Sequence, residues 1–350
     1  MNTGTNAPLR LGLAGLSHDH VAIVADVAPA DFEIVGACDP DAALLAAVGR
    51  ERKIAPERLF GDLPTMLRAT KPHAVAAFGP IDDHLAVVEA CAPAGVHVMV
   101  EKPLAVSVAH VERIAELARR HGVQVLTNYE TSWYPSIEHL FQAVRRGAVG
   151  TARKVLIRDG HGGPVESGCQ PQFLAWLTTS VSSGGGALND FGCYGANLMT
   201  FLMHGRLPDS VTAITRTFKP ELYGSVEDDA LIVLAYDALE AVIQASWNWP
   251  FARKDMEIHG ATGTIAAADR QTVWLRCSSD PEARLIVPDP LPCARSEPFT
   301  YLASIVRGEQ QPAPHALSAL DNNIGVVRIL DAARRSAVAG RTILLTDSVA

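Results

Sequence analysis

The sequence predicts an α/β domain with a doubly wound parallel sheet, followed by an α+β domain with a mostly antiparallel, open sheet. The length of 350 residues is enough for two domains with separate cores. Up to about Thr127, short apolar runs alternate with helix-length segments. Beyond about residue 150, apolar runs follow one another with short turns between them.

Five apolar runs in the first half are typical of buried strands: Leu9–Ala14, Glu33–Ala37, Ala74–Phe78, His97–Val100 and Val123–Thr127. Stretches with helical spacing follow them, among them Ala42–Val48, Leu85–Ala92 and Val108–Arg120. Strands separated by helices run parallel, and their right-handed crossovers give a doubly wound sheet.

The second half has seven predicted strands: Val155–Arg158, Ser210–Thr217, Ala230–Tyr236, Ala241–Trp247, Asp255–His259, Thr264–Ala267 and Val273–Arg276. One long helix is expected at Leu188–Met203, a loop at Pro288–Pro298, and closing helices at Phe299–Arg307 and Ala316–Ala339. We place the division at residues 1–128 and 129–350. Ile137–Arg146 can pack on either domain, and the last helices can pack back on the first.

Composition excludes several classes of partner. Lys plus Arg number 30 and Asp plus Glu 38, a net charge of −8 that does not attract nucleic acid or anionic lipid. No apolar stretch approaches the roughly 20 residues of a membrane span, and the polar Met1–Pro8 has no apolar signal core. The six cysteines lie far apart without a CxxC pair, which indicates reduced thiols and a cytoplasmic location.

The turn after the first strand is a candidate phosphate-binding site for a dinucleotide. Gly15 takes the first position of a GxGxxG pattern, while Ser17 and His20 replace the second and third glycines. Together with Leu16 and His18, these residues would surround the pyrophosphate at the start of a helix. His18 and His20 lack further ligands nearby in sequence, so we assign them phosphate-proximal or structural roles and predict no metal site.

Asp39 ends the second strand, 24 residues after Gly15. An acidic residue at about this distance binds the adenosine ribose hydroxyls in dinucleotide-binding folds, and its charge disfavours a 2′-phosphate. The cofactor predicted is therefore NAD, with NADP still possible. The alternative is that Asp39–Pro40–Asp41 is only a turn that begins a helix.

Four segments resemble the Gfo/Idh/MocA oxidoreductase family, in the branch with Tyr at the end of the second glycine-rich motif. They are the phosphate turn, Gly79–Pro80–Ile81–Asp82–Asp83–His84, the Glu101–Lys102–Pro103 signature, and Ser183–Tyr194, which is similar to GGGxLxDxGxH/Y. Ile329–Ser336 also resembles the closing helix of the family. The resemblance implies a Rossmann domain with Gly79, Pro80, His84, Glu101, Lys102 and Asn128 beside the cofactor, and a homodimer or homotetramer.

The chain departs from the family pattern at four places. Gly79 replaces the usual Thr, Tyr194 replaces the His of many members, and Asn197 stands where Asp is frequent. The stretch Asn128–Pro135 contains no Arg.

The candidate catalytic residues are Lys102, Asp190 and Tyr194. Oxidation of a carbinol needs an acceptor for the hydride and a group that moves the hydroxyl proton. Asp190 and Tyr194 are spaced i, i+4 on the expected helix and share a face that Asn197 extends. We expect Lys102 to lower the pKa of Tyr194, the proton carrier, and to stabilise charge on the substrate oxygen. The roles of Lys102 and Tyr194 can also be exchanged, and Asp190 would hold either a substrate hydroxyl or Lys102.

The predicted substrate is a sugar, cyclitol or related diol, bound by Lys102, Asp190 and Tyr194. Trp133, Tyr134 and Trp247–Trp249 would line a sugar-binding wall or else form part of the core. Lys102–Pro103 is a candidate cis peptide. Two alternatives stay open: a glycosidase-like reaction with transient redox of the nicotinamide, and a sensor that binds the dinucleotide without catalysis.

Overall fold

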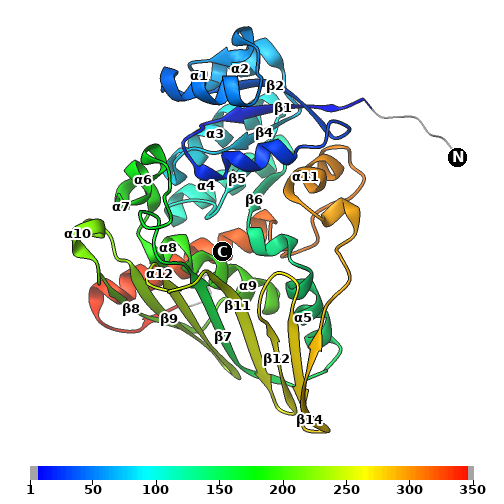
Figure 1. The fold of residues 1–350 in the computed structure, drawn as a ribbon, viewed down its shortest axis with the longest axis vertical. Coiled ribbons are helices and arrows are strands. Elements are labelled where there is room, and N and C mark those ends of the chain that lie inside the picture. Colours follow the sequence, from blue (N-terminus) through cyan, green and yellow to red (C-terminus); the bar gives the residue numbers. More distant parts are fainter. Residues whose placement is uncertain (1–6, 346–350) are drawn as a thin grey trace, which may run out of the picture.

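The computed structural model describes residues 7–345, so most of the polar segment Met1–Pro8 lies outside the described residues. Two sheets follow one another along the long axis of the molecule (Figure 1). The first sheet has six parallel strands in the order β3–β2–β1–β4–β5–β6. The strands are β1 (Leu9–Ala14), β2 (Phe32–Cys38), β3 (Leu59–Phe60), β4 (Ala74–Ala77), β5 (His97–Glu101) and β6 (Val125–Asn128). This order is that of a doubly wound dinucleotide-binding sheet, as predicted.

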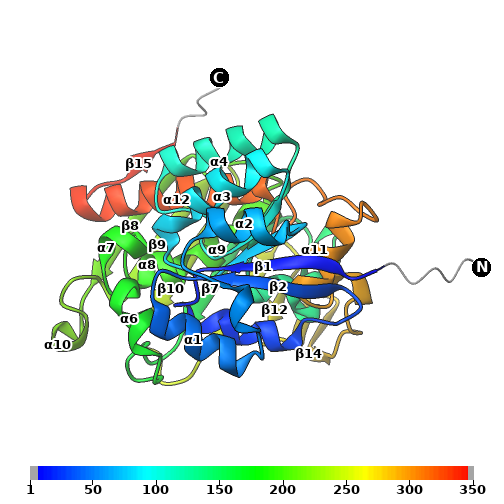
Figure 2. The ribbon, with the colours of Figure 1, turned by 90° about the horizontal axis from the view of Figure 1, so that it is seen from above.

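Helices cover both faces of the parallel sheet (Figure 2). One face carries α2 (Leu63–Thr70), α3 (His84–Cys91) and α4 (Val108–His121). The other carries α1 (Ala42–Glu51), the 3-10 helix η1 (Asp19–Asp26) and, from much later in the chain, α11 (Pro298–Val306). The short 3-10 turns are η2 (Pro56–Arg58), η3 (Ile81–Asp83), η4 (Ala92–Ala94), η5 (Glu130–Trp133) and η6 (Cys293–Arg295). A helix from late in the chain thus contributes to the core of the first sheet.

The second sheet has nine strands in the order β14–β13–β12–β11–β7–β10–β9–β8–β15. Neighbouring strands are antiparallel except β7 and β10, which run parallel at its centre. The strands are β7 (Ala152–Gly160), β8 (Ser210–Arg216), β9 (Asp229–Tyr236), β10 (Leu239–Ser246), β11 (Arg253–Gly260), β12 (Gly263–Ala267), β13 (Val273–Cys277), β14 (Asp280–Ile286) and β15 (Ile343–Leu344). The sequence missed β3, β14 and β15, of which β3 and β15 are two residues long and β14 is mostly exposed.

The helices of the second half pack on one face of this sheet or beside the cleft. They are α5 (Pro135–Arg145), α6 (Pro171–Leu177), α7 (Ser180–Ser183), α8 (Ala187–Asp190), α9 (Gly192–Leu202), α10 (Pro220–Tyr223) and α12 (Leu320–Ala339). Of these, α5 contacts β12 and β13 and so belongs to the large sheet. In the part of the chain that the structure describes, no helix is long and apolar enough to cross a bilayer.

The single helix predicted at Leu188–Met203 is in fact two. The helix is interrupted at Phe191: α8 ends at Asp190, and α9 begins at Gly192. Gly192 lets the backbone approach the sheet here, because a Cβ at this position would lie 3.0 Å from the Ile232 side chain. The break leaves the carbonyl oxygen of Asp190 available to side chains, which matters for the site below.

Candidate active site

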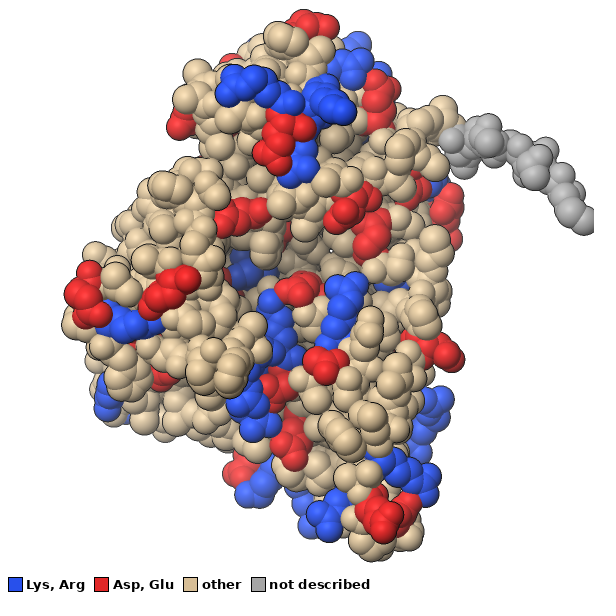
Figure 3. Space-filling model, viewed as in Figure 1, with Lys and Arg blue, Asp and Glu red and all other residues tan. Residues whose placement is uncertain are grey.

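The predicted site residues meet where the carboxyl ends of β1, β2, β4, β5 and β6 face the large sheet. The space-filling view shows a hollow there, with Lys and Arg side chains interspersed with Asp and Glu (Figure 3). A cavity of about 300 Å³ lies at the β1–β2–β4 end, and one of about 500 Å³ lies against the large sheet. In open α/β sheets, ligands bind outside the carboxyl ends of the strands.

In the phosphate turn, the backbones of Gly15 and Gly79 lie close together. Gly15 has a positive φ of 68°, and a Cβ there would lie 2.7 Å from the Gly79 backbone, so only glycine fits. Asp39 accepts a hydrogen bond from the Leu16 amide through Oδ2 (2.7 Å) and from the Asp41 amide through Oδ1 (2.8 Å). Asp41, not Asp39, caps α1. Asp39 thus ties the turn to the end of β2.

The cavity beside this turn suits an uncharged adenosine ribose. Its lining includes three carboxylates, those of Asp39, Asp62 and Asp83, and it contains no Lys or Arg. Carboxylates bind ribose hydroxyls and repel a 2′-phosphate. The residues that line this cavity therefore fit the adenosine end of NAD.

The turn does not continue into an α-helix as expected but into the 3-10 helix η1. Ser17 accepts a hydrogen bond from the Trp176 indole (3.1 Å), so its hydroxyl contacts α6 of the second half. His18 is buried against Phe173 and Trp176, and burial lowers the pKa of its imidazole well below the usual range. These contacts connect the turn to the opposite wall of the cleft.

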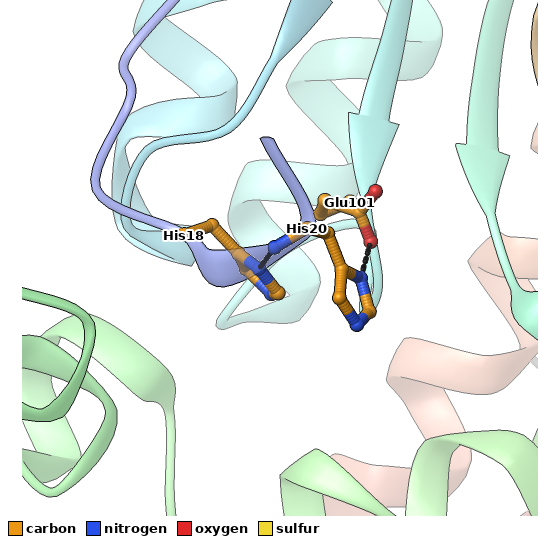
Figure 4. A group of neighbouring side chains, drawn as sticks. All are labelled: His18, His20 and Glu101. Carbon is orange, nitrogen blue, oxygen red and sulfur yellow. Dashed lines mark hydrogen bonds and ion pairs between the residues drawn. The ribbon is translucent and has the colours of Figure 1, made fainter. Parts of the chain in front are cut away.

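His18 and His20 converge with Glu101, which the sequence did not indicate. Figure 4 shows the two imidazoles beside each other at the start of η1, with the His20 ring turned toward Glu101 at the end of β5. His20 Nδ1 lies 2.8 Å from Glu101 Oε2, and the ligand atoms of all three residues lie within 4.8 Å of one another. The argument that the two histidines lack a third ligand is therefore wrong. His18 Nδ1 already accepts a hydrogen bond from the His20 amide, so we read the group as holding Glu101 in place.

Glu101 is held from both sides. Its second oxygen accepts a hydrogen bond from Asn128 Nδ2 (2.8 Å), and Asn128 Oδ1 accepts one from the Trp133 indole (2.9 Å). Burial raises the pKa of Glu101, but His20 and Asn128 lower it by more, so the group is a carboxylate. Trp133 also packs near Tyr301 and lines the cavity that contains His20 and Asn128.

The other predicted cofactor residues are near the same edge. Gly79 lines the adenosine-side cavity, and Pro80 precedes η3. His84 is buried, with Nδ1 3.2 Å from the carbonyl oxygen of Leu104, and burial lowers its pKa to about 4. A neutral His84 therefore holds the loop that follows Glu101–Lys102–Pro103. Within this signature the Lys102–Pro103 peptide is cis, as predicted.

Lys102 forms a buried ion pair with Asp190. Its Nζ contacts Asp190 Oδ1 and donates to the Asp190 carbonyl oxygen (3.0 Å), which the helix break exposes. Asp190 Oδ2 accepts from the Trp247 indole (2.9 Å). Burial opposes both charges, yet the pairing outweighs it: the pKa of Asp190 is lowered and that of Lys102 is raised. Trp247 is wholly buried, so the idea that it lines a sugar-binding wall is wrong.

Tyr194 lies beside Lys102, but its pKa differs from the expectation. Lys102 Nζ is 5.4 Å from the centre of the Tyr194 ring. Burial raises the pKa of the phenol well above its usual value, and Glu130 and Asp159 add to this effect. The expected lowering of this pKa by Lys102 is therefore wrong, because burial and the nearby carboxylates raise it instead. Asn197 does not extend the site, since its amide donates to the carbonyl oxygen of Leu317.

A second lysine faces the same ring, and sequence reasoning missed it. Lys254 Nζ on β11 lies 5.1 Å from the Tyr194 ring centre and pairs with Glu130. The segment Asn128–Pro135 contains no Arg, and this lysine supplies a cation to it from the large sheet. The lack of an Arg in this segment indicated that a cation had to come from elsewhere, but nothing in the sequence indicated that β11 would supply it.

Asp159 on β7 was also missed. It stands opposite Lys254 in the antiparallel register of β7 and β11. Its carboxylate is buried, and neither oxygen has a hydrogen-bond partner in the structure. Burial raises its pKa well above the usual value, although Lys254 and Lys102 oppose this shift. A protonable carboxyl group therefore lies behind the two lysines.

Comparison with known proteins agrees with this architecture. Residues 10–129 match the model of an oxidoreductase family with an NAD-binding Rossmann fold, and residues 137–266 match the GFO/IDH/MocA C-terminal domain. The chain belongs to the GFO/IDH/MocA oxidoreductase family. The resemblance inferred from the motifs is confirmed, and so are the fold class and the assignment as an oxidoreductase of an NAD-binding family.

Curated relatives are distant. D-apiose dehydrogenase of Paraburkholderia graminis is 27% identical, over 96% of this chain and 88% of its own length. Trans-1,2-dihydrobenzene-1,2-diol dehydrogenase of Xenopus laevis is 29% identical over 55% of this chain and 53% of its own.

Solved structures share the fold over nearly the whole chain. An inositol dehydrogenase homolog from Azotobacter vinelandii, complexed with NAD+, has a TM-score of 0.84 at 18% identity and covers 97% of both chains. Aldose-aldose oxidoreductase from Caulobacter crescentus, complexed with glycerol, has a TM-score of 0.80 at 22% identity and covers 97% of this chain and all of that one.

Proposed function

We propose that this protein transfers a hydride between NAD and a carbinol or carbonyl carbon of a sugar, cyclitol or related diol. The observation that carries the proposal is the convergence of Lys102, Asp190 and Tyr194 beside the carboxyl end of β5. Family relatives named for D-apiose, a dihydrobenzene diol and inositol support a polyhydroxylated substrate. Residues 1–128 would hold the cofactor, and residues 129–350 would supply most of the substrate site.

The chain's own residues would manage the proton and the developing charge. When bound, NAD supplies the hydride acceptor or donor at its nicotinamide ring. The raised pKa keeps Tyr194 a phenol, which can give its proton to a carbonyl oxygen in reduction and regain it in oxidation. Lys102 and Lys254 both lie within 5.4 Å of the ring centre and would stabilise negative charge on the substrate oxygen. Asp190 positions Lys102 rather than acting on substrate.

The cofactor assignments rest on the turn and its cavity. Gly15, Leu16, Ser17 and His18 would surround the pyrophosphate, and Asp39 would face the adenosine ribose. Glu101 and Asn128 would lie near the nicotinamide end. A titration should show tighter binding of NADH than of NADPH, because carboxylates without a cation line the adenosine side.

The test of the proposal is Lys102→Met, assayed with NAD+ and a panel of sugars and polyols. We expect turnover to fall about 10³-fold, while NADH binding changes little. Lys154→Met, at an exposed lysine on β7, is the matched control and should behave as wild type. Undiminished turnover in Lys102→Met would remove this residue from catalysis. Product formed without net NADH would instead favour the glycosidase-like reaction.

Two further assignments are proposals. The six cysteines are all free, which supports a reducing, cytoplasmic setting. Ile214, Trp274 and Leu285 are exposed on strands of the large sheet, which supports association into a homodimer or homotetramer. Light scattering of the purified chain would measure its mass, and a monomer at micromolar concentration would contradict the latter.

A further inference from the structure

The cavity against the large sheet is rich in cations. About 500 Å³ in volume, it is lined by four basic side chains, those of Arg158, Arg253, Lys254 and Arg270, and three acidic ones, those of Glu130, Asp255 and Asp269. Phe191 and Lys254 also line it, and they lie next to the proposed proton-transfer groups: the Phe191 ring is 5.5 Å from Lys102 Nζ, and Lys254 Nζ is 5.1 Å from the Tyr194 ring centre. A volume of this size accommodates a six-carbon substrate.

Most of these cations are already paired. Arg158 and Arg253 share the two oxygens of Asp255, at 2.8 Å each, and Arg158 also contacts Glu257. Lys254 pairs with Glu130. Their charges are thus satisfied within the protein, and they leave little attraction for an anion.

Arg270 differs from the other three. Among residues 7–345 its guanidinium makes no ion pair and no hydrogen bond, and it lies 5.3 Å from the centre of the Tyr134 ring. Its neighbour Asp269 does not pair with it; that carboxylate accepts a hydrogen bond from the Gln271 amide. The turn is nevertheless fixed, since Ser136 at the start of α5 donates to the carbonyl oxygens of Asp269 and Arg270.

Arg270 also lies between two cavities and lines both of them. It lines the large-sheet cavity and, on its other side, the cavity that contains His20, Asn128 and Trp133. Tyr134, beneath the guanidinium, bonds to Glu130, which pairs with Lys254 over Tyr194. An unpaired Arg on a fixed turn, in the same cavity lining as the Lys254 that lies beside the Tyr194 ring, has the geometry of an anion subsite. Arginine presents two parallel N–H groups that match a carboxylate.

We propose that the substrate is a polyhydroxylated carboxylic acid, such as an aldonate or uronate, whose carboxylate binds Arg270 while its reacting carbinol lies at Lys102 and Tyr194. This rests on the proposed function for the location of the reacting carbon. The carboxylate itself is not transformed; it fixes which hydroxyl faces the nicotinamide. Neutral sugars of the same size would enter the cavity but lack this anchor.

The test compares matched pairs that differ only in one carboxylate: D-galacturonate with D-galactose, and D-gluconate with D-glucitol. We expect the acid of at least one pair to have a higher kcat/KM in the wild type, with a KM that rises with salt. Arg270→Gln should lower kcat/KM for that acid by roughly ten- to hundredfold, mainly through KM, and by much more than for the neutral partner. Arg276→Gln, at an exposed arginine on the neighbouring β13, is the control and should change neither.

Binding separates this inference from the proposed function. Calorimetry with NADH-loaded protein measures acid binding whether or not turnover occurs. Binding of an acid that Arg270→Gln abolishes supports the subsite even if no hydride is transferred. Preference for the neutral partner in both pairs, or equal losses for acid and neutral sugar in Arg270→Gln, would overturn it. A weaker affinity for NADH in Arg270→Gln, with unchanged acid binding, would overturn it as well and assign the residue to the cofactor.

Discussion

The two lysines near the Phe191 and Tyr194 rings lie in different surroundings, one buried and one partly exposed. Lys102 and Asp190 have side chains only 6% and 7% exposed, whereas Lys254 and Glu130 are 23% and 42% exposed. The first pair is fixed by a second hydrogen bond to a carbonyl and by the Trp247 indole. The Lys254–Glu130 pair lines the large-sheet cavity, where a bound molecule can replace one member of the ion pair. We infer that Lys102 sets geometry as well as charge, while Lys254 is free to respond to what is bound.

The largest effect is expected at the buried pair. Asp190→Asn leaves the Lys102 ammonium in the interior without its carboxylate, so the free energy of unfolding should fall by roughly 3–5 kcal/mol, with loss of turnover. Urea denaturation followed by fluorescence measures this. The double variant Lys102→Met/Asp190→Leu should regain most of the stability but not the activity. If Asp190→Asn loses less stability than the double variant, then an unpaired buried ammonium does not cause the loss, and this explanation is wrong.

An intermediate effect is expected at the exposed pair. Lys254→Gln should cost under about 1 kcal/mol of stability, because a partly exposed ion pair contributes little. Its kcat should nevertheless fall by at least about tenfold, since one of two ammonium groups near the reacting oxygen is lost. Steady-state kinetics beside urea denaturation checks both parts. A Lys254→Gln enzyme with wild-type kcat would restrict the chemistry to the buried lysine.

The last effect is a pH dependence of stability at Asp159, a buried carboxyl group whose raised pKa both lysines oppose. Its pKa is raised in the folded chain, so the folded state binds this proton more tightly than the unfolded state does. The stabilisation is fully present below about pH 4 and is lost as the pH rises through the folded pKa. Asp159→Asn cannot ionise, so its stability relative to wild type should improve with pH, by at most about 1.4 kcal/mol per unit. The check is the urea midpoint of the wild type and of Asp159→Asn, each measured at pH 5 and at pH 8. If the midpoint changes by the same amount between the two pH values in both proteins, the pKa of Asp159 is not raised.

The sequence predicted the cofactor end better than the substrate end, and the reason is physical. Gly15, Asp39 and Lys102 each follow a buried strand and Glu101 ends one, and parallel strands bring their carboxyl ends to one edge wherever the helices lie. Lys254 joins the site only because β11 pairs with β7 in the register that puts it opposite Asp159. Pairing between strands about 100 residues apart has no local signal in the chain. The helix break at Phe191 was also missed, and the close approach of Gly192 to Ile232 beside it joins residues 40 positions apart in the sequence.

Helix α12 has a consequence for the order in which the protein is made. Val327 belongs to the core of the parallel sheet, while Val326 and Leu330 belong to that of the large sheet. Further along, Arg334 donates to carbonyl oxygens in the loops that follow Lys102 and precede Asp190. These connections are made by residues 326–334, which follow every proposed catalytic residue in the sequence. Synthesis must therefore pass Arg334 before the two halves of the proposed site can be joined, and a nascent chain that stops before Leu320 contains every proposed catalytic residue but not the helix that connects the two halves.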